Sequence, residues 1–162
     1  MRIVLTLLGI VAIVIYSVFG MMLMNDWAVV AASGVPLDTT IADMDAASQQ
    51  YSAIPGFVFA APGILLALAW GVTTLYRRTA LPNWATVSIW AGIIALGAPA
   101  YVFTAFGNLN SVGDTYYDWN AEAAFALEAP LYMVSGIAFL VAVSALMAAL
   151  IRMTMRKKSS PV

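Results

Sequence analysis

The chain has 162 residues, of which 63% are hydrophobic and 9% are charged, and its formal net charge is −1. About a quarter of the residues of a soluble domain are charged, so this composition predicts one all-α, polytopic membrane domain over residues 1–162. The chain contains no cysteine and no histidine, which excludes disulfides, thiolate chemistry and histidine-ligated metals or haem.

Four apolar runs are long enough to cross the hydrocarbon core as helices, which takes about 20 residues each. The polar segment at the middle of the chain carries Arg77 and Arg78, flanked by the interface-type aromatic residues Tyr76 and Trp84. The expected spans are residues 3–24, 55–75, 84–106 and 130–151.

Charged residues are segregated along the chain. The eight acidic residues lie in the two remaining gaps between apolar runs, and the seven basic residues lie at the chain ends and in the central segment. Because short basic segments stay in the cytoplasm, the four spans are expected to form two helical hairpins with both termini cytoplasmic, in a bacterial cytoplasmic (inner) membrane. The basic residues are Arg2, Arg77, Arg78, Arg152, Arg156, Lys157 and Lys158.

The first apolar run has a second interpretation, as a cleaved signal peptide. Val30-Ala31-Ala32 resembles a cleavage site. The run is longer than the usual apolar region of about 7–15 residues, and Asn25-Asp26-Trp27 separates it from that site. These features favour a first membrane span.

The two acidic gaps, residues 25–54 and 107–129, are the expected extracytoplasmic loops, each with a short helix. In the first gap, Asp38 or Thr40 can cap a helix, and in the second Asp118 or Asn120 can cap a helix over residues 121–127. The ordered ligand pattern of a calcium loop is missing, so the acidic residues are interpreted as solvated loop residues and not as a metal site.

Two prolines lie inside the expected second and third spans. Each removes a backbone N–H and should kink its helix, freeing the carbonyl groups of Val58 and Ala95 respectively. Both kinks fall in the outer half of the membrane, where two bent neighbours can leave an outward-facing cleft; a role in packing alone is the alternative. The candidate cleft residues are Pro62, Pro99, Tyr101, Thr104, Glu128 and Tyr132.

Small residues share one face of the fourth span, at spacings that return to the same side of a helix. Such a face favours close helix packing, within the bundle or with another subunit. The candidate packing residues are Ala138, Ala142, Ala145 and Ala149.

Aromatic residues cluster in the expected outer loops. They suit anchoring at the membrane surface, and Trp and Tyr are also enriched in binding hot spots. The candidate partner contacts are Trp27, Tyr51, Tyr116, Tyr117 and Trp119.

The two halves of the chain share an outline. Pro55 and Arg77 are as far apart in sequence as Pro130 and Arg152, and an Asp-Trp pair follows the first and the third span. An internal duplication explains this outline, and so do the features common to any two membrane hairpins.

The sequence contains no motif that indicates catalysis or phosphate binding. There is no histidine base and no phosphate-binding glycine loop, and no ionisable residue lies in the middle of a span. We therefore expect no enzymatic activity, no cofactor and no nucleic-acid binding. The sequence favours an accessory or scaffold subunit whose partners are the lipid bilayer and other membrane subunits or copies of itself. The alternative is a small oligomeric transporter or channel with an outward-facing cleft near Pro62 and Pro99.

The predicted orientation can be tested with single cysteines, because the natural chain has none. Cysteines at Ser48 and Ser111 should react with a membrane-impermeant thiol reagent in intact cells. Cysteines at Thr79 and Ser159 should react only after the cells are lysed. The opposite pattern would contradict the orientation argued from the basic residues.

Overall fold

The chain is described by a computed structural model that covers residues 2–76 and 81–158, and every element in these ranges is helical. Four of the helical segments are long and apolar enough to cross a membrane, which confirms that part of the prediction. The elements are α1 (Arg2–Met22), the π-helical turn η1 (Leu23–Trp27), α2 (Ala28–Ser33), α3 (Leu37–Ala46), α4 (Ile54–Tyr76), α5 (Asn83–Ala95), α6 (Gly97–Thr115) and α7 (Ala121–Lys158).

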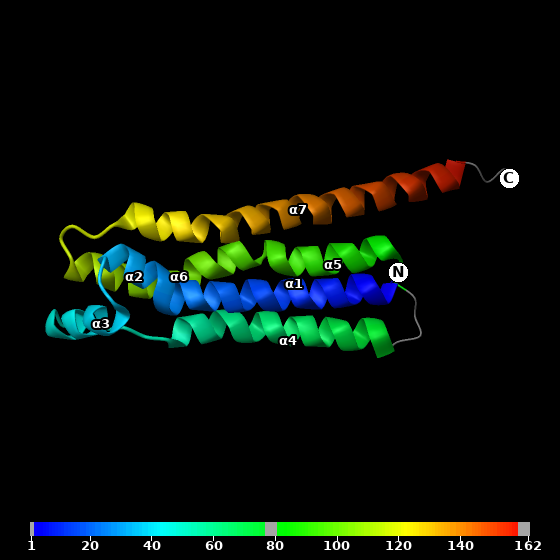
Figure 1. Cartoon of the computed structure of the whole chain (residues 1–162). Coiled ribbons are helices and arrows are strands. Elements are labelled where there is room, and N and C mark those ends of the chain that lie inside the picture. Colours follow the sequence, from blue (N-terminus) through cyan, green and yellow to red (C-terminus); the bar gives the residue numbers. More distant parts are fainter. Residues whose placement is uncertain (1, 77–80, 159–162) are drawn as a thin grey trace.

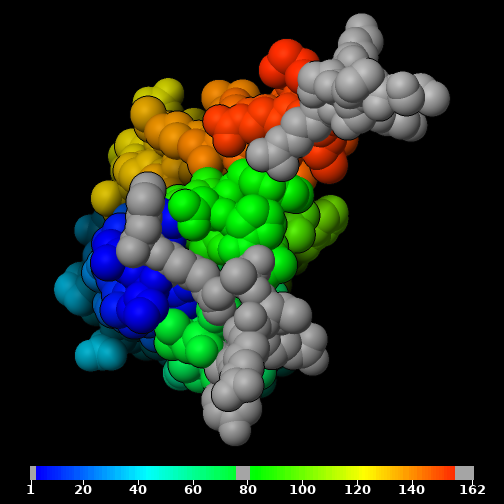
Figure 2. Space-filling view, turned by 90° about the vertical axis from the view of Figure 1, so that its right-hand side faces the viewer, coloured from blue at the N-terminus to red at the C-terminus, as the bar shows by residue number. Residues whose placement is uncertain are grey.

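The long helices run side by side, with α1 in contact with both α4 and α5, and α5 in contact with α7 (Figure 1). Seen from the end of the bundle that holds the termini, the start of α5 lies between α1 and α7 (Figure 2). At the opposite end, α2 and the π-helical turn η1 also contact α7. Helix α7 is therefore held by α5 along the bundle and by α2 and η1 at the end that holds α3.

Three of the four apolar segments are longer than one membrane crossing. They have 31, 33 and 35 residues, whereas the segment in α4 has 22. At 1.5 Å per residue the three reach about 46–53 Å, against a hydrocarbon core of about 30 Å. Beyond the start of α4, their extensions pack together with α3 (Figure 1).

These extensions form a second apolar core. We call this part of the molecule the head: α2, α3 and residues 109–124, which end α6 and begin α7. Its buried side chains are separate from the larger core between α1, α4, α5, α6 and α7. The head core consists of Ala28, Val29, Ala32, Met44, Val112 and Ala124.

Helix boundaries near the head differ from the sequence prediction. The first helix does not end near Met24: it continues through η1 and α2 to Gly34, whose left-handed backbone (φ 73°) suits glycine and ends the helix. The short helix α3 begins at Leu37 after Pro36, so neither Asp38 nor Thr40 caps it, which corrects the prediction.

The short helix expected at residues 121–127 is not a separate element but the first turns of α7, which continues through Pro130. The predicted cap at its start is confirmed, because the side-chain oxygen of Asn120 accepts a hydrogen bond from the N–H of Ala123 at 2.9 Å. Pro130 removes only one backbone donor, and the helix tolerates it.

The third span is divided at Leu96, between α5 and α6, three residues before Pro99. Proline has no N–H for the carbonyl of Ala95, as predicted. A second cause comes from α7: the hydroxyl of Ser135 accepts from the N–H of Ala98 at 3.1 Å and donates to the carbonyl of Ile94 at 2.8 Å. These two backbone groups would bond each other in an unbroken helix. The Ser135 hydroxyl is therefore inserted into the row of backbone hydrogen bonds of the third span.

Ser135 also fixes the position of α1. Its hydroxyl lies 2.7 Å from the hydroxyl of Tyr16. Because the single proton of Ser135 is donated to Ile94, Tyr16 is the donor of this bond. One buried side chain thus joins α1, both halves of the broken helix and α7.

We predict that Ser135→Ala destabilises the fold by about 1–3 kcal/mol, because it leaves the buried hydroxyl of Tyr16 and the N–H of Ala98 without partners. The matched control is Ser144→Ala, since Ser144 is exposed on the same helix. Unfolding in mixed micelles with increasing sodium dodecyl sulfate, followed by circular dichroism, measures both. Equal stabilities for the two variants would contradict the role of Ser135.

Candidate functional site

Helix α7 turns one continuous face toward the rest of the bundle. The face follows alternating spacings of four and three residues, the pattern of helices that pack with a slight left-handed twist. Glu128 is on this face and is therefore turned inward. Its members are Ala124, Glu128, Leu131, Ser135, Ala138, Ala142 and Ala149, all buried, and the partly buried Ala145.

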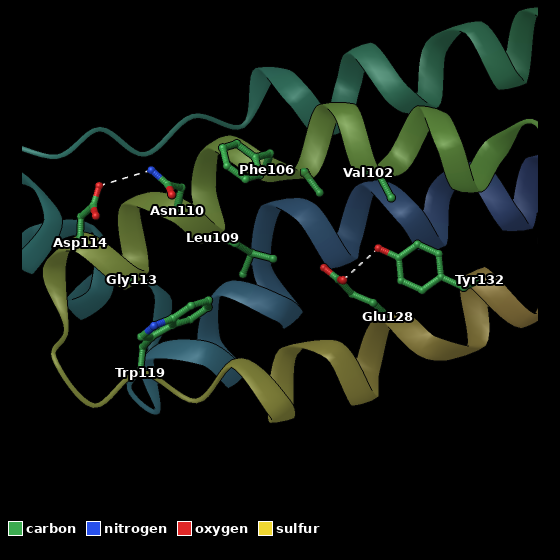
Figure 3. A pocket seen from close by; sticks show the side chains of 10 residues that line it. Val102, Phe106, Leu109, Asn110, Gly113, Asp114, Trp119, Glu128 and Tyr132 are labelled. Carbon is green, nitrogen blue, oxygen red and sulfur yellow. Dashed lines mark hydrogen bonds between the residues drawn. The ribbon is translucent and has the colours of Figure 1, made fainter.

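Glu128 is a buried carboxylate, with 5% of its surface exposed. The phenol hydroxyl of Tyr101 on α6 donates to Oε1 at 2.8 Å, and that of Tyr132, one turn along α7, donates to Oε2 at 3.2 Å. The rings of the two tyrosines meet edge to face at 5.9 Å. Two donors, one on each oxygen, fix the direction of the carboxylate, and Figure 3 shows the bond from Tyr132.

A groove of about 530 Å³ lies between α6 and α7 beside this carboxylate (Figure 3). Glu128 and Tyr132 line it from α7. A second hollow of about 490 Å³ is adjacent and shares Leu109, Trp119 and Glu128 with the first. The other residues of the first groove are Val102, Ala105, Phe106, Leu109, Asn110, Gly113, Asp114 and Trp119.

All the charged residues that line the groove are acidic. Two of its lining residues, Asp114 and Glu128, are acidic, and none is basic. Helix α6 contains no basic residue, and the first one on α7 after Glu128 is Arg152, about 36 Å further along the helix. The hydrogen bonds to Glu128 therefore come from neutral phenols.

The six residues of the predicted cleft lie in different places. Glu128 and Tyr132 line the groove, and the fully buried Tyr101 bonds to Glu128 beneath it. Thr104 is half-buried, and its hydroxyl donates to the carbonyl of Ala100.

Pro62 and Pro99 do not line that groove. Pro62 lines a separate small cavity of about 120 Å³ between α1, α4 and the break in the third span. Gly63 is next to it, and a Cβ there would overlap the hydroxyl of Ser17, so glycine permits the close approach of α1 and α4. Pro99 is exposed on the surface of the bundle.

The four alanines of the predicted packing face are directed into the chain itself. Ala138, Ala142 and Ala149 are buried, and Ala138 and Ala142 pack in the same core as Ala91 and Ile94 of α5. Large apolar side chains cover the other sides of α7, such as Leu140 with 64% exposure.

The five candidate partner contacts fall into two groups. Tyr51 donates to the backbone carbonyl of Asn25 and so ties the segment before α4 to η1, whereas Tyr116 donates to Oδ2 of Asp43 at 2.7 Å and joins the end of α6 to α3 within the head. Burial raises the pKa of both phenols, with the Asp26 carboxylate contributing at Tyr51 and the bond to Asp43 contributing at Tyr116.

The other group is exposed. Tyr117 is 99% exposed, and Trp27 and Trp119 are exposed by 41% and 37%. Trp27 packs edge to face against Phe19, with ring centres 5.5 Å apart. Among the described residues, no three acidic side chains come close enough together to hold a metal ion.

Asn108 on α6 is a site residue that the sequence analysis missed. It is 4% exposed, and it accepts from the N–H of Ser52 at 3.0 Å while its amide donates to the carbonyls of Ser52 (2.8 Å) and Met24 (3.1 Å). The bond to Met24 satisfies a carbonyl inside the π-helical turn. Asn108 thus joins α6 to η1 and to the segment that leads into α4.

Comparison with known proteins gives no relative: no protein-family model, no curated protein and no solved structure matches the chain.

We predict that Asn108→Asp destabilises the head by more than about 2 kcal/mol, because a carboxylate oxygen would then face two carbonyl oxygens in a buried site. The matched control is Asn110→Asp on the exposed side of the same helix, where the new carboxylate would face Asp114 one turn along and the expected cost is about 0.5 kcal/mol. Hydrogen exchange of the α2 and α6 amides reports the difference. Unchanged protection in Asn108→Asp would contradict this role.

Proposed function

We propose that the protein is a non-catalytic integral membrane protein that serves as an accessory or scaffold subunit of a larger membrane assembly. In this proposal the long helices form two hairpins in a bacterial cytoplasmic membrane, both termini are cytoplasmic, and the head lies on the opposite side. The head is the part that binds the partner.

The observation that carries the proposal is the head itself. Three apolar segments exceed one membrane thickness by about 16–23 Å, and the parts of them that lie beyond the start of α4 build a second apolar core. Anchoring four helices in lipid requires no such extension. A small rigid platform held clear of the membrane is useful for presenting side chains to another molecule.

The surface of the head supports a binding role. Tyr117 and Trp119 are exposed in the turn between α6 and α7, and exposed aromatic residues of this kind are typical anchors of interfaces. The head has no basic residue and carries most of the acidic ones, so a partner with a basic surface would be favoured. These acidic residues are Asp38, Asp43, Asp45, Asp114, Asp118 and Glu122.

Photo-crosslinking from a single position tests the proposal. With p-benzoylphenylalanine in place of Tyr117, irradiation of intact cells should give one adduct of fixed mass that contains a second protein. The same probe at Leu140, which is 64% exposed on α7, should give no discrete protein adduct because lipid surrounds it.

Raising the salt concentration of isolated membranes before irradiation should weaken the Tyr117 adduct if the acidic head attracts its partner. An equal pattern of adducts from Tyr117 and Leu140 would contradict the proposal that the head binds a partner.

The alternative function is a small oligomeric transporter or channel with an outward-facing cleft near Pro62 and Pro99. The observation that favours it is the buried Glu128 beside an open groove, since buried ionisable groups in membrane helices often belong to substrate paths. An adduct between two copies of the chain, with no second protein, would favour this alternative over the accessory subunit.

A further inference from the structure

We propose that the groove between α6 and α7 binds an amphiphilic organic cation, a positively charged group on an apolar body, with Glu128 as its counter-ion. This inference goes beyond the accessory role and does not depend on it.

The charge of Glu128 is the first argument. Two hydroxyl donors, at 2.8 and 3.2 Å, occupy separate oxygens of the side chain, an arrangement that suits an ionised carboxylate because this group only accepts hydrogen bonds. A buried carboxylate is costly unless a cation accompanies it. The lining of the groove contains no basic side chain, so the missing partner is a positive charge from outside the chain.

The shape and chemistry of the walls are the second argument. The volume of about 530 Å³ suits a small organic molecule, since ligand sites usually have about 300–1,000 Å³. Val102, Phe106 and Leu109 give one wall an apolar surface. Trp119 and Tyr132 add aromatic rings, which attract organic cations through their faces.

The position of the groove is the third argument. Counting about 20 residues of helix from the interface residue Trp84 places the other membrane surface near Thr104. The groove runs from Val102 to Asp114 along α6 and therefore crosses that surface. Amphiphilic cations collect at this level, with the charge toward water and the apolar body in lipid.

The ammonium group of a phosphatidylethanolamine headgroup could also supply the positive charge beside Glu128. That headgroup also carries a phosphate, and the groove offers it two carboxylates and no basic residue. Repulsion between like charges disfavours the lipid, so we assign the site to a free cation.

Equilibrium binding of tetraphenylphosphonium to the purified full chain in a neutral detergent tests the assignment. The cation should bind saturably at one site per chain, and tetraphenylborate, an anion of nearly the same size and shape, should not. Glu128→Gln should weaken binding of the cation by at least about tenfold, because it removes the counter-ion. Asp45→Asn makes the same change of charge on exposed α3 and should leave the affinity unchanged.

A second variant separates loss of binding from loss of folding. Val102→Trp should fill the groove from a position that is 52% exposed, while leaving the carboxylate and its two tyrosines in place. It should abolish binding, whereas Leu140→Trp on the exposed side of α7 should not.

Three results would overturn the proposal. One is equal binding of the two probes, and another is full affinity in either Glu128→Gln or Val102→Trp. The third is displacement of tetraphenylphosphonium by phosphatidylethanolamine and not by phosphatidylglycerol, because it would make a lipid headgroup the occupant.

Discussion

The fold depends on the hydroxyl of Ser135, because it takes the place of a backbone hydrogen bond in the third span. It bridges the carbonyl of Ile94 and the N–H of Ala98 and accepts a bond from Tyr16. In lipid, freed backbone groups must find partners within the protein. Pro99 makes the break in the third span possible, and Ser135 makes it stable while tying α1 and α7 to it.

The groove follows from the same helix face. Glu128 lies two steps of the four-and-three pattern before Ser135, so the face that closes the bundle also turns a carboxylate inward. Beyond the break, α6 places Tyr101 against that carboxylate. Further along, α6 and α7 are separated by the groove, and Trp119 at the turn between them lines both hollows. Two hydrogen bonds thus hold the Glu128 carboxylate at the edge of the groove.

The head and the groove are neighbours and share residues 109–124. Asn108, just before them, fixes α6 to the π-helical turn and to the segment before α4 through three hydrogen bonds. A partner bound to the head would touch the same turn that lines the groove. The two proposed roles, binding a protein at Tyr117 and a cation at Glu128, therefore occupy adjacent surfaces at the same end of the molecule.

The sequence by itself determined four helices long and apolar enough to cross a membrane, the break near Pro99 and, as one of two candidates with Asp118, the cap at Asn120, because apolar length, a missing N–H and a side-chain acceptor act locally. It did not determine where the helices end. The predicted spans stop short of the helix ends, and α2 and the start of α7 stay helical because the head core covers them. Nor did the sequence show that Pro62 and Glu128 line different cavities. Continuing the alanine pattern of α7 backwards through Ser135 and Leu131 would have indicated that Glu128 faces inward. Its two tyrosine partners and the groove required the tertiary structure, since they depend on how α6 packs against α7 after the break.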